Sequence, residues 1–218
     1  FLLISSGVLA KTAAPEETPV WGTLPNGTLV STGSPNGAFG PRIAARDNGS
    51  QIMITFSKEI ASGNNDPYFS FSTDNGKSWS TPAAIYSSSA NSVQPVVAYA
   101  GNTAHAAWIE RAATESLRTA PRSAWPATNP TSIATSTFPS DIQDPDIAAS
   151  GDFIYIVWGQ GFPDNIRIRF SRSTNGGTSY SAGIVIDPTS LTDASTPDRA
   201  LDTAGRVHVV CARVSSGI

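Results

Sequence analysis

Apolar and polar positions follow one repeating order along this chain, and that order predicts short strands. Four segments begin with a proline and continue with a mostly apolar stretch, and their prolines are 54, 50 and 52 residues apart: Pro41–Ala44, Pro95–Ala98, Pro145–Ala148 and Pro197–Ala200. A glycine turn follows each segment, at Gly49, Gly101, Gly151 and Gly205, and a second apolar stretch then follows at 52–56, 104–108, 154–158 and 207–211. Proline is tolerated at the first position of a strand, where its missing N–H costs no ladder bond. Each segment therefore predicts two strands joined by a turn.

A third and a fourth strand follow in the first and third repeats. Tyr68–Phe71 and Ile166–Phe170 are predicted third strands, and the latter alternates apolar and basic residues as a half-buried strand does. A polar octapeptide and a further apolar segment come next, at Ser72–Trp79 with Ala83–Tyr86 and at Ser173–Tyr180 with Gly183–Ile186. The second repeat is degraded. Its third strand is Ser116–Thr119, and Arg122–Trp125 is a shortened turn.

Four strands in roughly 50 residues describe the blade of a β-propeller, an all-β fold of four-stranded antiparallel blades around an axis. The predicted blades are residues 36–90, 91–138, 139–190 and an incomplete fourth at 191–218. A six-bladed ring at this period would need roughly 300 residues, so we expect a partial propeller with about three and a half blades. The alternative, a β-sandwich, gives no reason for the fixed order of the repeat.

Composition narrows the class of protein. The chain has 218 residues, 39% of them hydrophobic and only 14% charged, which argues against disorder. The net charge of −3 supplies no basic stripe, so nucleic-acid binding is not expected. Residues 1–35 are expected to be a leader: 1–10 resemble the end of a signal-peptide apolar region, which predicts a secreted or cell-surface protein. No apolar run is long enough to span a bilayer.

The octapeptide Ser72–Trp79 has the pattern S-x-D-x-G-x-S/T-W, which resembles the Asp-box, or bacterial neuraminidase (BNR) repeat, of sialidase-like propellers. Its pattern residues are Ser72, Asp74, Gly76 and Trp79. The second copy is degenerate and consists of Ser173, Asn175, Gly177 and Tyr180, with Asn for Asp and Tyr for Trp. In that family the Asp-box is structural and lies on the face away from the active site. The resemblance thus implies a sialidase-like glycoside hydrolase, with its chemistry at the opposite ends of the strands.

Function is therefore expected in the loops that enter the first strands and in those that join second to third strands. They are Asn36–Pro41, Ser57–Pro67, Ser88–Pro95, Glu110–Glu115, Ser140–Pro145, Gly159–Asn165 and Asp193–Pro197.

Arg42 is the candidate substrate-binding residue. Sialidases open their first blade with Arg-Ile-Pro, whose arginine binds the substrate carboxylate, and Arg42-Ile43 stands in that place with Ala44 in place of the family's Pro. A guanidinium suits a carboxylate because its planar fork donates two parallel hydrogen bonds. The repeat offers an alternative, because Arg42 occupies a variable slot that Val96, Asp146 and Asp198 fill in the later repeats.

A sialidase also needs a carboxylic acid as its acid/base catalyst. The resemblance implies Asp66, with Glu59 as the second candidate. The alternative for Asp66 is a structural one, because Asn64–Pro67 is a typical turn sequence. The later arginines, the tyrosine nucleophile and its glutamate partner are not found in this sequence, so the fragment is expected to be inactive by itself.

No cofactor is predicted. Asp141, Asp144 and Asp146, with Gln143, offer hard oxygen ligands for Ca²⁺, but their spacing fits no calcium loop, and a solvated acidic loop is the alternative. Two functions remain open. The first is an exo-sialidase acting on terminal sialic acid of a glycan. The second is a non-catalytic extracellular propeller that binds glycan or protein.

Overall fold

Strands make up nearly all of the regular structure in the computed structural model, which describes residues 37–46, 49–137, 141–161, 166–187, 194–202 and 204–213. The expected leader at 1–35 lies outside these residues. The strands are β1 (Ala38–Arg46), β2 (Gln51–Ala61), β3 (Asn64–Ser72), β4 (Ala83–Ala84), β5 (Asn91–Ala100), β6 (Thr103–Arg111), β7 (Glu115–Pro121), β8 (Thr131–Ser136), β9 (Ile142–Ser150), β10 (Phe153–Gln160), β11 (Arg167–Ser173), β12 (Ile184–Val185), β13 (Ala194–Leu201) and β14 (Val207–Arg213). A 3₁₀ turn, Arg122–Ala124, lies in the shortened turn of the second repeat. No helix in the described ranges is long and apolar enough to cross a bilayer.

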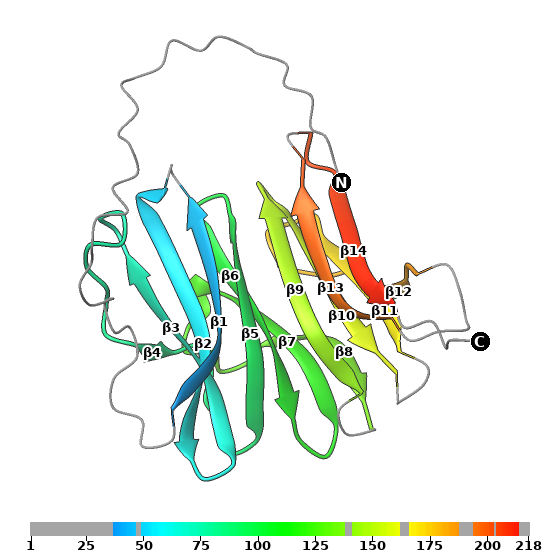
Figure 1. Cartoon of the computed structure of the whole chain (residues 1–218), viewed down its shortest axis with the longest axis horizontal. Coiled ribbons are helices and arrows are strands. Elements are labelled where there is room, and N and C mark those ends of the chain that lie inside the picture. Colours follow the sequence, from blue (N-terminus) through cyan, green and yellow to red (C-terminus); the bar gives the residue numbers. More distant parts are fainter. Residues whose placement is uncertain are drawn as a thin grey trace.

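The strands form four antiparallel meanders. Sheet β1–β4 is called blade 1, β5–β8 blade 2, β9–β12 blade 3 and the pair β13–β14 blade 4. The first strands β1, β5, β9 and β13 lie side by side (Figure 1), and each contacts the next. This radial arrangement around a line of first strands is that of a partial β-propeller. The predicted all-β propeller is confirmed.

The core consists of two layers between blades. One layer joins blade 1 to blade 2 through Met53, Phe69, Ile85 and Trp108, and the other joins blade 2 to blade 3 through Ile109, Leu117, Ile147 and Trp158. Strand β6 serves both layers, because its residues alternate between the two faces of the sheet. Trp108 therefore packs toward blade 1, whereas its neighbour Ile109 packs toward blade 3.

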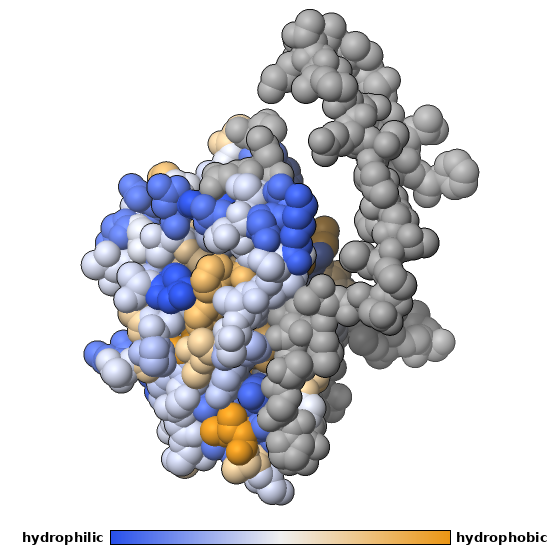
Figure 2. Space-filling view, turned by 90° about the vertical axis from the view of Figure 1, so that its left-hand side faces the viewer, coloured by the Kyte–Doolittle hydropathy of each residue, from blue (hydrophilic) through white to orange (hydrophobic). Residues whose placement is uncertain are grey.

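Blade 2 has a complete four-stranded blade on each side, whereas blade 3 has blade 2 on one side and only the pair β13–β14 on the other. The large hydrophobic side chains that remain exposed in the described part of the chain come from the other blades: Phe39, Ile43, Ile60, Phe153, Ile184, Val185, Ile186 and Val210. Figure 2, seen from the side of blade 1, shows an apolar band set between hydrophilic regions. A blade thus buries both faces only where neighbours flank it, as expected for a stacked repeat.

Several strands are longer than the sequence predicts. The expected loop Ser57–Pro67 is mostly strand: β2 continues to Ala61, β3 begins at Asn64, and the connection is a tight turn containing Gly63 at a φ of 73°. The predicted turn at Asn64–Pro67 is therefore wrong, and Asp66 pairs with Lys58 inside the sheet. The reason is that these strand ends are polar. Periodicity of apolar residues marks only the buried part of a strand.

Candidate functional site at the axis

A bulge interrupts the first strand of every blade at the same repeat position. The residue before each repeat proline has a left-handed backbone, with φ of 62° at Gly40, 54° at Gln94, 47° at Asp144 and 47° at Thr196. The pairing register shifts beside each of them. Positive φ is uncommon for residues other than glycine, and a following proline further disfavours helical values of ψ. Such strain persists only where surrounding structure imposes it, and it clusters at functional sites.

Hydrogen bonds between blades hold two of these bulges. The backbone N–H of Gln94 donates to Oγ of Ser57 in blade 1 over 3.2 Å. The side chain of Gln94 then bonds Asp144 of blade 3 twice: its Oε1 accepts from the Asp144 N–H at 3.1 Å, and its Nε2 donates to Oδ1 at 3.4 Å. Blades 1, 2 and 3 are thereby joined through one line of polar contacts at the axis.

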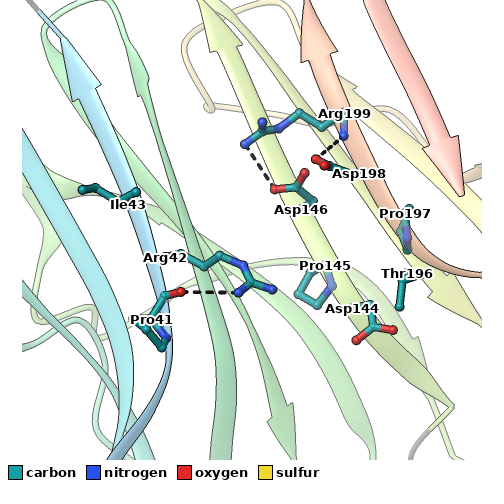
Figure 3. Close-up of a pocket in the computed structure, with 10 residues that line it drawn as sticks. All are labelled: Pro41, Arg42, Ile43, Asp144, Pro145, Asp146, Thr196, Pro197, Asp198 and Arg199. Atoms are coloured by element: carbon teal, nitrogen blue, oxygen red, sulfur yellow. Dashed lines mark hydrogen bonds and ion pairs between the residues drawn. The ribbon is translucent and has the colours of Figure 1, made fainter. Parts of the chain in front are cut away.

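The bulged regions of β1, β9 and β13 line a cavity of about 560 Å³. Its walls are Pro41–Ile43 of β1, Asp144–Asp146 of β9 and Thr196–Arg199 of β13. Figure 3 shows these residues on β1, β9 and β13, with Arg42 reaching across the space between the strands. The volume lies within the range of small-ligand sites in proteins. We call this cavity the axial pocket.

Two carboxyl groups and an arginine meet in the axial pocket. Nη2 of Arg199 on β13 lies 3.1 Å from Oδ1 of Asp146 on β9 (Figure 3). The carboxyl groups of Asp146 and Asp198 also interact, and each shifts the pKa of the other. The pKa of Asp146 is raised to about 6, mainly by burial and also by the neighbouring Asp198, although the charge of Arg199 opposes the rise. The pKa of Asp198 is lowered, mainly by the backbone N–H of Arg199 and then by the side chain of Asp146. Of the two carboxyls, Asp146 is therefore the one that keeps its proton to higher pH.

Arg42 lines the same pocket. Its side chain is exposed, and Nη1 donates to the carbonyl of Pro41 over 3.3 Å. Figure 3 shows its guanidinium reaching from β1 toward β9. Its charge contributes to the lowered pKa of Asp198 on β13. Arg42 thus faces the carboxyl pair with donors free to meet an anionic group of a ligand.

The structure places Asp66 and Glu59 away from the walls of the axial pocket. Asp66, on β3, is fully buried, and burial raises its pKa. Its Oδ1 accepts a 3.4 Å hydrogen bond from the N–H of Ser88, in the segment that leads to blade 2. Oε1 of Glu59 accepts from the N–H of Gly63 and so closes the β2–β3 turn. Of Arg42, Asp66 and Glu59, the three residues that the sialidase resemblance implies, Arg42 alone lines the pocket.

Asp141, just before β9, and the two aspartates of β9 do not converge on one point. Oδ2 of Asp141 accepts from Nε2 of Gln160, Asp144 is bonded to Gln94, and Asp146 to Arg199. The described residues contain no group of three or more His, Cys, Asp or Glu side chains arranged to hold a metal ion. Asp144 and Asp146 contribute to the axial pocket instead of a calcium loop.

The two octapeptides form the same hydrogen-bonded turn. Oγ of Ser72 donates to Asp74 at 2.7 Å and accepts from the N–H of Gly76 at 2.8 Å, and Ser173 makes the equivalent bonds to Asn175 and Gly177 at 2.9 Å each. Oδ1 of Asp74 accepts from the N–H of Ser78, as Asn175 does from Ser179.

The aromatic residues Trp79 and Tyr180 follow these turns. The ring of Trp79 lies beside Gly76, and Tyr180 packs against the layer between blades 2 and 3. Both turns follow third strands, whereas the bulges lie where these strands begin. The octapeptides are thus at the opposite end of the sheets from the axial pocket.

Three residues of the pocket, which the sequence analysis did not assign to it, stand at marked positions of the repeat: Asp146, Asp198 and Arg199. The phrase Pro-x-Ile-Ala becomes Pro-Asp-Arg-Ala in the fourth repeat, where Arg199 replaces an apolar residue. Asp146 and Asp198 fill the same repeat slot as Arg42. A ring of equivalent slots around an axis places such residues close together, although they are far apart in sequence.

Comparisons with known proteins identify the fold. No family model matches the sequence, and no curated protein matches it. The xylan β-1,4-xylosidase from Bacillus halodurans C-125 superimposes with a TM-score of 0.54 at 14% identity over 83% of this chain and 38% of that one. The sialidase Hz136 from a Hadza microbial source gives 0.54 at 10% identity over 80% of this chain and 40% of that one. The endo-arabinase from Bacteroides thetaiotaomicron VPI-5482 gives 0.55 at 10% identity over 81% and 75%.

These likenesses define the class of fold. The chain has the β-propeller architecture found in several glycoside hydrolases, and it spans about 38% of the xylosidase. The similarity extends to a xylosidase and an arabinase as much as to a sialidase, so the fold does not single out sialic acid. At sequence identities of 10–14%, these similarities establish the fold but not the activity or the substrate.

Proposed function

We propose that the axial pocket binds the terminal sugar of a glycan and hydrolyses its glycosidic bond. The observation that carries this proposal is the pair Asp146 and Asp198, whose surroundings move their pKa values in opposite directions. Paired titratable groups of this kind supply the acid and the counter-charge in glycoside hydrolysis. The shared fold with a xylosidase, an arabinase and a sialidase supports a carbohydrate ligand.

Asp146 has the properties of the general acid. A pKa of about 6 leaves the group mostly protonated in mildly acidic solution and still able to release its proton near neutrality. In the proposed step, the Asp146 proton passes to the oxygen of the leaving group as the bond to the anomeric carbon breaks. The neighbouring Asp198 helps to keep that proton on Asp146 beforehand, and Arg199 stabilises the Asp146 carboxylate that remains.

A second carboxylate must activate water or attack the sugar. Asp198 lies beside the acid in the same pocket, so the proposal does not give it the role on the far side of a sugar ring. The remaining carboxylate on the wall is Asp144, which a strained backbone and Gln94 hold in position. The proposal gives the base role to Asp144.

Because of Arg42, we propose that the preferred substrate is a sugar that carries a carboxylate. The exposed guanidinium of Arg42 faces the pocket and suits a bidentate bond to such a group. Sialic acid is the sugar that the resemblance of Arg42-Ile43 to the sialidase opening implies. The apolar sequence of residues 1–10 supports export of the protein to the place where such glycans occur.

An alternative function is glycan or protein binding without catalysis. The observation that favours it is a structural role shared by the two aspartates. Oδ1 of Asp146 accepts from the N–H of Ile147 at 2.9 Å, and Oδ1 of Asp198 accepts from the N–H of Arg199 at 2.7 Å. The same local hydrogen bond in two blades is expected if each aspartate stabilises the backbone of its own bulge. Binding without turnover distinguishes this function from hydrolysis.

The test is a hydrolysis assay on a panel of fluorogenic glycosides: an α-sialoside, a β-glucuronide, a β-xyloside and an α-arabinofuranoside. The sialidase resemblance implies an inactive fragment, but the proposed acid, base and arginine all lie in this chain. The proposal therefore predicts turnover of at least one acidic glycoside by the chain, and a loss of about 100-fold or more in the Asp146→Asn variant. Because the chain spans less than half of the xylosidase and the sialidase, the same assay on any longer natural form is the matched experiment. Absence of turnover on every glycoside by both forms, with binding retained, would favour the alternative.

A further inference from the structure

A second cavity adjoins the axial pocket at the mouth formed by the first three bulges. It has a volume of about 210 Å³ and shares Arg42, Asp144 and Pro145 with the axial pocket. Its remaining wall comes from Phe39 and Gly40 of β1 and from 94–96 of β5. The cavity therefore lies between blades 1, 2 and 3, whereas the axial pocket is lined by blades 1, 3 and 4. Arg42 stands on the boundary between the two.

Phe39 gives this second cavity an aromatic wall. The side chain is 47% exposed and comes directly before the left-handed Gly40, outside both core layers. An exposed ring beside a polar cavity offers the negative face of its π-system to C–H groups. Sugar rings have such C–H groups on their flatter faces. Phe39 is therefore suited to stack against a sugar.

Gln94 and Asp144 give the cavity its polar wall. Their reciprocal bonds, at 3.1 and 3.4 Å, fix an amide and a carboxylate side by side. Both residues have left-handed backbones before proline, a conformation with a steric cost that is often found at functional sites. An amide and a carboxylate together can donate to and accept from hydroxyl groups. One apolar face opposite hydroxyl-binding groups is the usual composition of a small-ligand site.

We propose that this cavity is a second saccharide subsite, which binds the sugar next to the one in the axial pocket through Phe39 and Gln94. The proposal rests on the proposed function in one respect, that the axial pocket holds a sugar. It makes the ligand an oligosaccharide, with its terminal unit beside Asp146 and the next unit stacked on Phe39. The two units are then separated by Arg42 on the shared wall.

The test compares affinities for one and three sugar units by calorimetry, with N-acetylneuraminic acid against 3′-sialyllactose and xylose against xylotriose as probes. We expect the chain to bind one of the trisaccharides about tenfold or more tightly than its monosaccharide. Phe39→Ala should reduce that ratio to near one and leave monosaccharide affinity unchanged. Gln94→Met, which keeps the length of the side chain and removes the amide, should lower trisaccharide affinity several-fold.

Phe153→Ala is the matched control, because Phe153 is 46% exposed at the start of β10 and outside both cavities. It should leave the ratio unchanged. Equal affinities for one and three units, or a ratio that Phe39→Ala does not alter, would overturn the subsite. Absence of binding to all four probes would overturn the subsite and the proposed ligand class together. A ratio that depends on Phe39, in a protein without hydrolytic activity, would support the subsite and overturn only the catalytic function.

Discussion

Arg199 on β13 and Asp146 on β9 form an ion pair of 3.1 Å across the first strands of blades 4 and 3. The pair lies inside the axial pocket, and the guanidinium opposes the effect of burial on the pKa of Asp146. Removing the positive charge should therefore raise this pKa above its value of about 6. Removing the Asp198 charge should lower it.

These opposite shifts predict opposite movements of the pH–rate profile. If Asp146 acts while protonated, the alkaline limb should move to higher pH in Arg199→Ala and to lower pH in Asp198→Asn. The measurement is kcat/KM against pH on the best glycoside of the panel. Arg206→Ala serves as a control, because Arg206 pairs with Asp202 at 2.6 Å in the β13–β14 connection, outside the pocket. If the alkaline limb moved in the same direction in Arg199→Ala and in Asp198→Asn, this role for Asp146 would be excluded.

Arg42 should select for acidic sugars. Arg42→Ala removes two charged hydrogen bonds to a carboxylate, which should raise KM for an acidic glycoside about 10- to 100-fold. A neutral glycoside should be affected by less than about threefold. Arg42→Lys keeps the charge without the fork and should give an intermediate KM. An equal rise for acidic and neutral glycosides would show that Arg42 only shapes the pocket.

The turn at Gly177 should be sensitive to one added methyl group. A Cβ at Gly177 would lie 2.8 Å from Cε1 of His105 on β6, whereas a Cβ at the neighbouring Gly176 would have Oδ1 of Asp152 at 3.9 Å as its nearest atom. Both glycines have positive φ, so both alanine variants carry the same kind of backbone cost. Gly177→Ala should lower the free energy of unfolding by about 1–3 kcal/mol more than Gly176→Ala, measured by urea denaturation. Equal losses would mean that His105 moves aside freely.

His105 and Asp146 should have opposite effects on stability between pH 4 and 6. Burial lowers the pKa of His105 to about 4, so its unfolded form, with a pKa of 6.5, gains a proton first and stability falls as pH falls. Burial raises the pKa of Asp146 from 3.8 to about 6, so its stabilising effect is lost as pH rises through this range. Each group alone contributes a slope of up to about 1.4 kcal/mol per pH unit.

Single variants separate the two slopes. His105→Gln should leave a free energy of unfolding that falls more, or rises less, with pH than that of the parent chain. Asp146→Asn should change the slope in the opposite sense. The measurement is urea unfolding at half-unit steps from pH 4 to 6.5. An unchanged slope in either variant would show that its group titrates alike in the folded and unfolded chain.

The repeat predicted the fold well because propeller blades are local meanders. Gly101 and Trp108 mark a turn and a buried face through short-range chemistry, and that chemistry repeats. The expectation that a repeat proline begins its strand is wrong, because β5 begins at Asn91 and Pro95 follows the bulge inside it. Strand ends were predicted less well. The polar residues near Asp66 continue a strand, because backbone pairing with β2 holds them there and burial of apolar side chains does not.

The site was predicted only in part for a different reason. Arg42 was predicted because the short motif Arg42-Ile43 resembles the opening of a sialidase blade. Asp146 and Arg199 are 53 residues apart, and their contact depends on how two blades sit around the axis. The left-handed bulge at Asp144 was also unpredicted, because a polar residue before proline typically indicates an extended backbone.

The central claim, that Asp146 gives its proton to a leaving group, is tested most directly by varying that leaving group. An aryl leaving group of low pKa departs without protonation, whereas a sugar hydroxyl needs a proton. Comparing kcat/KM of Asp146→Asn and of Asp66→Asn with that of the parent on both kinds of substrate separates the two buried carboxyls. The account predicts that Asp146→Asn loses about 100-fold or more on the natural glycosidic bond and far less on the activated aryl glycoside, while Asp66→Asn loses similar amounts on both. A leaving-group-dependent loss in Asp66→Asn, with none in Asp146→Asn, would contradict it.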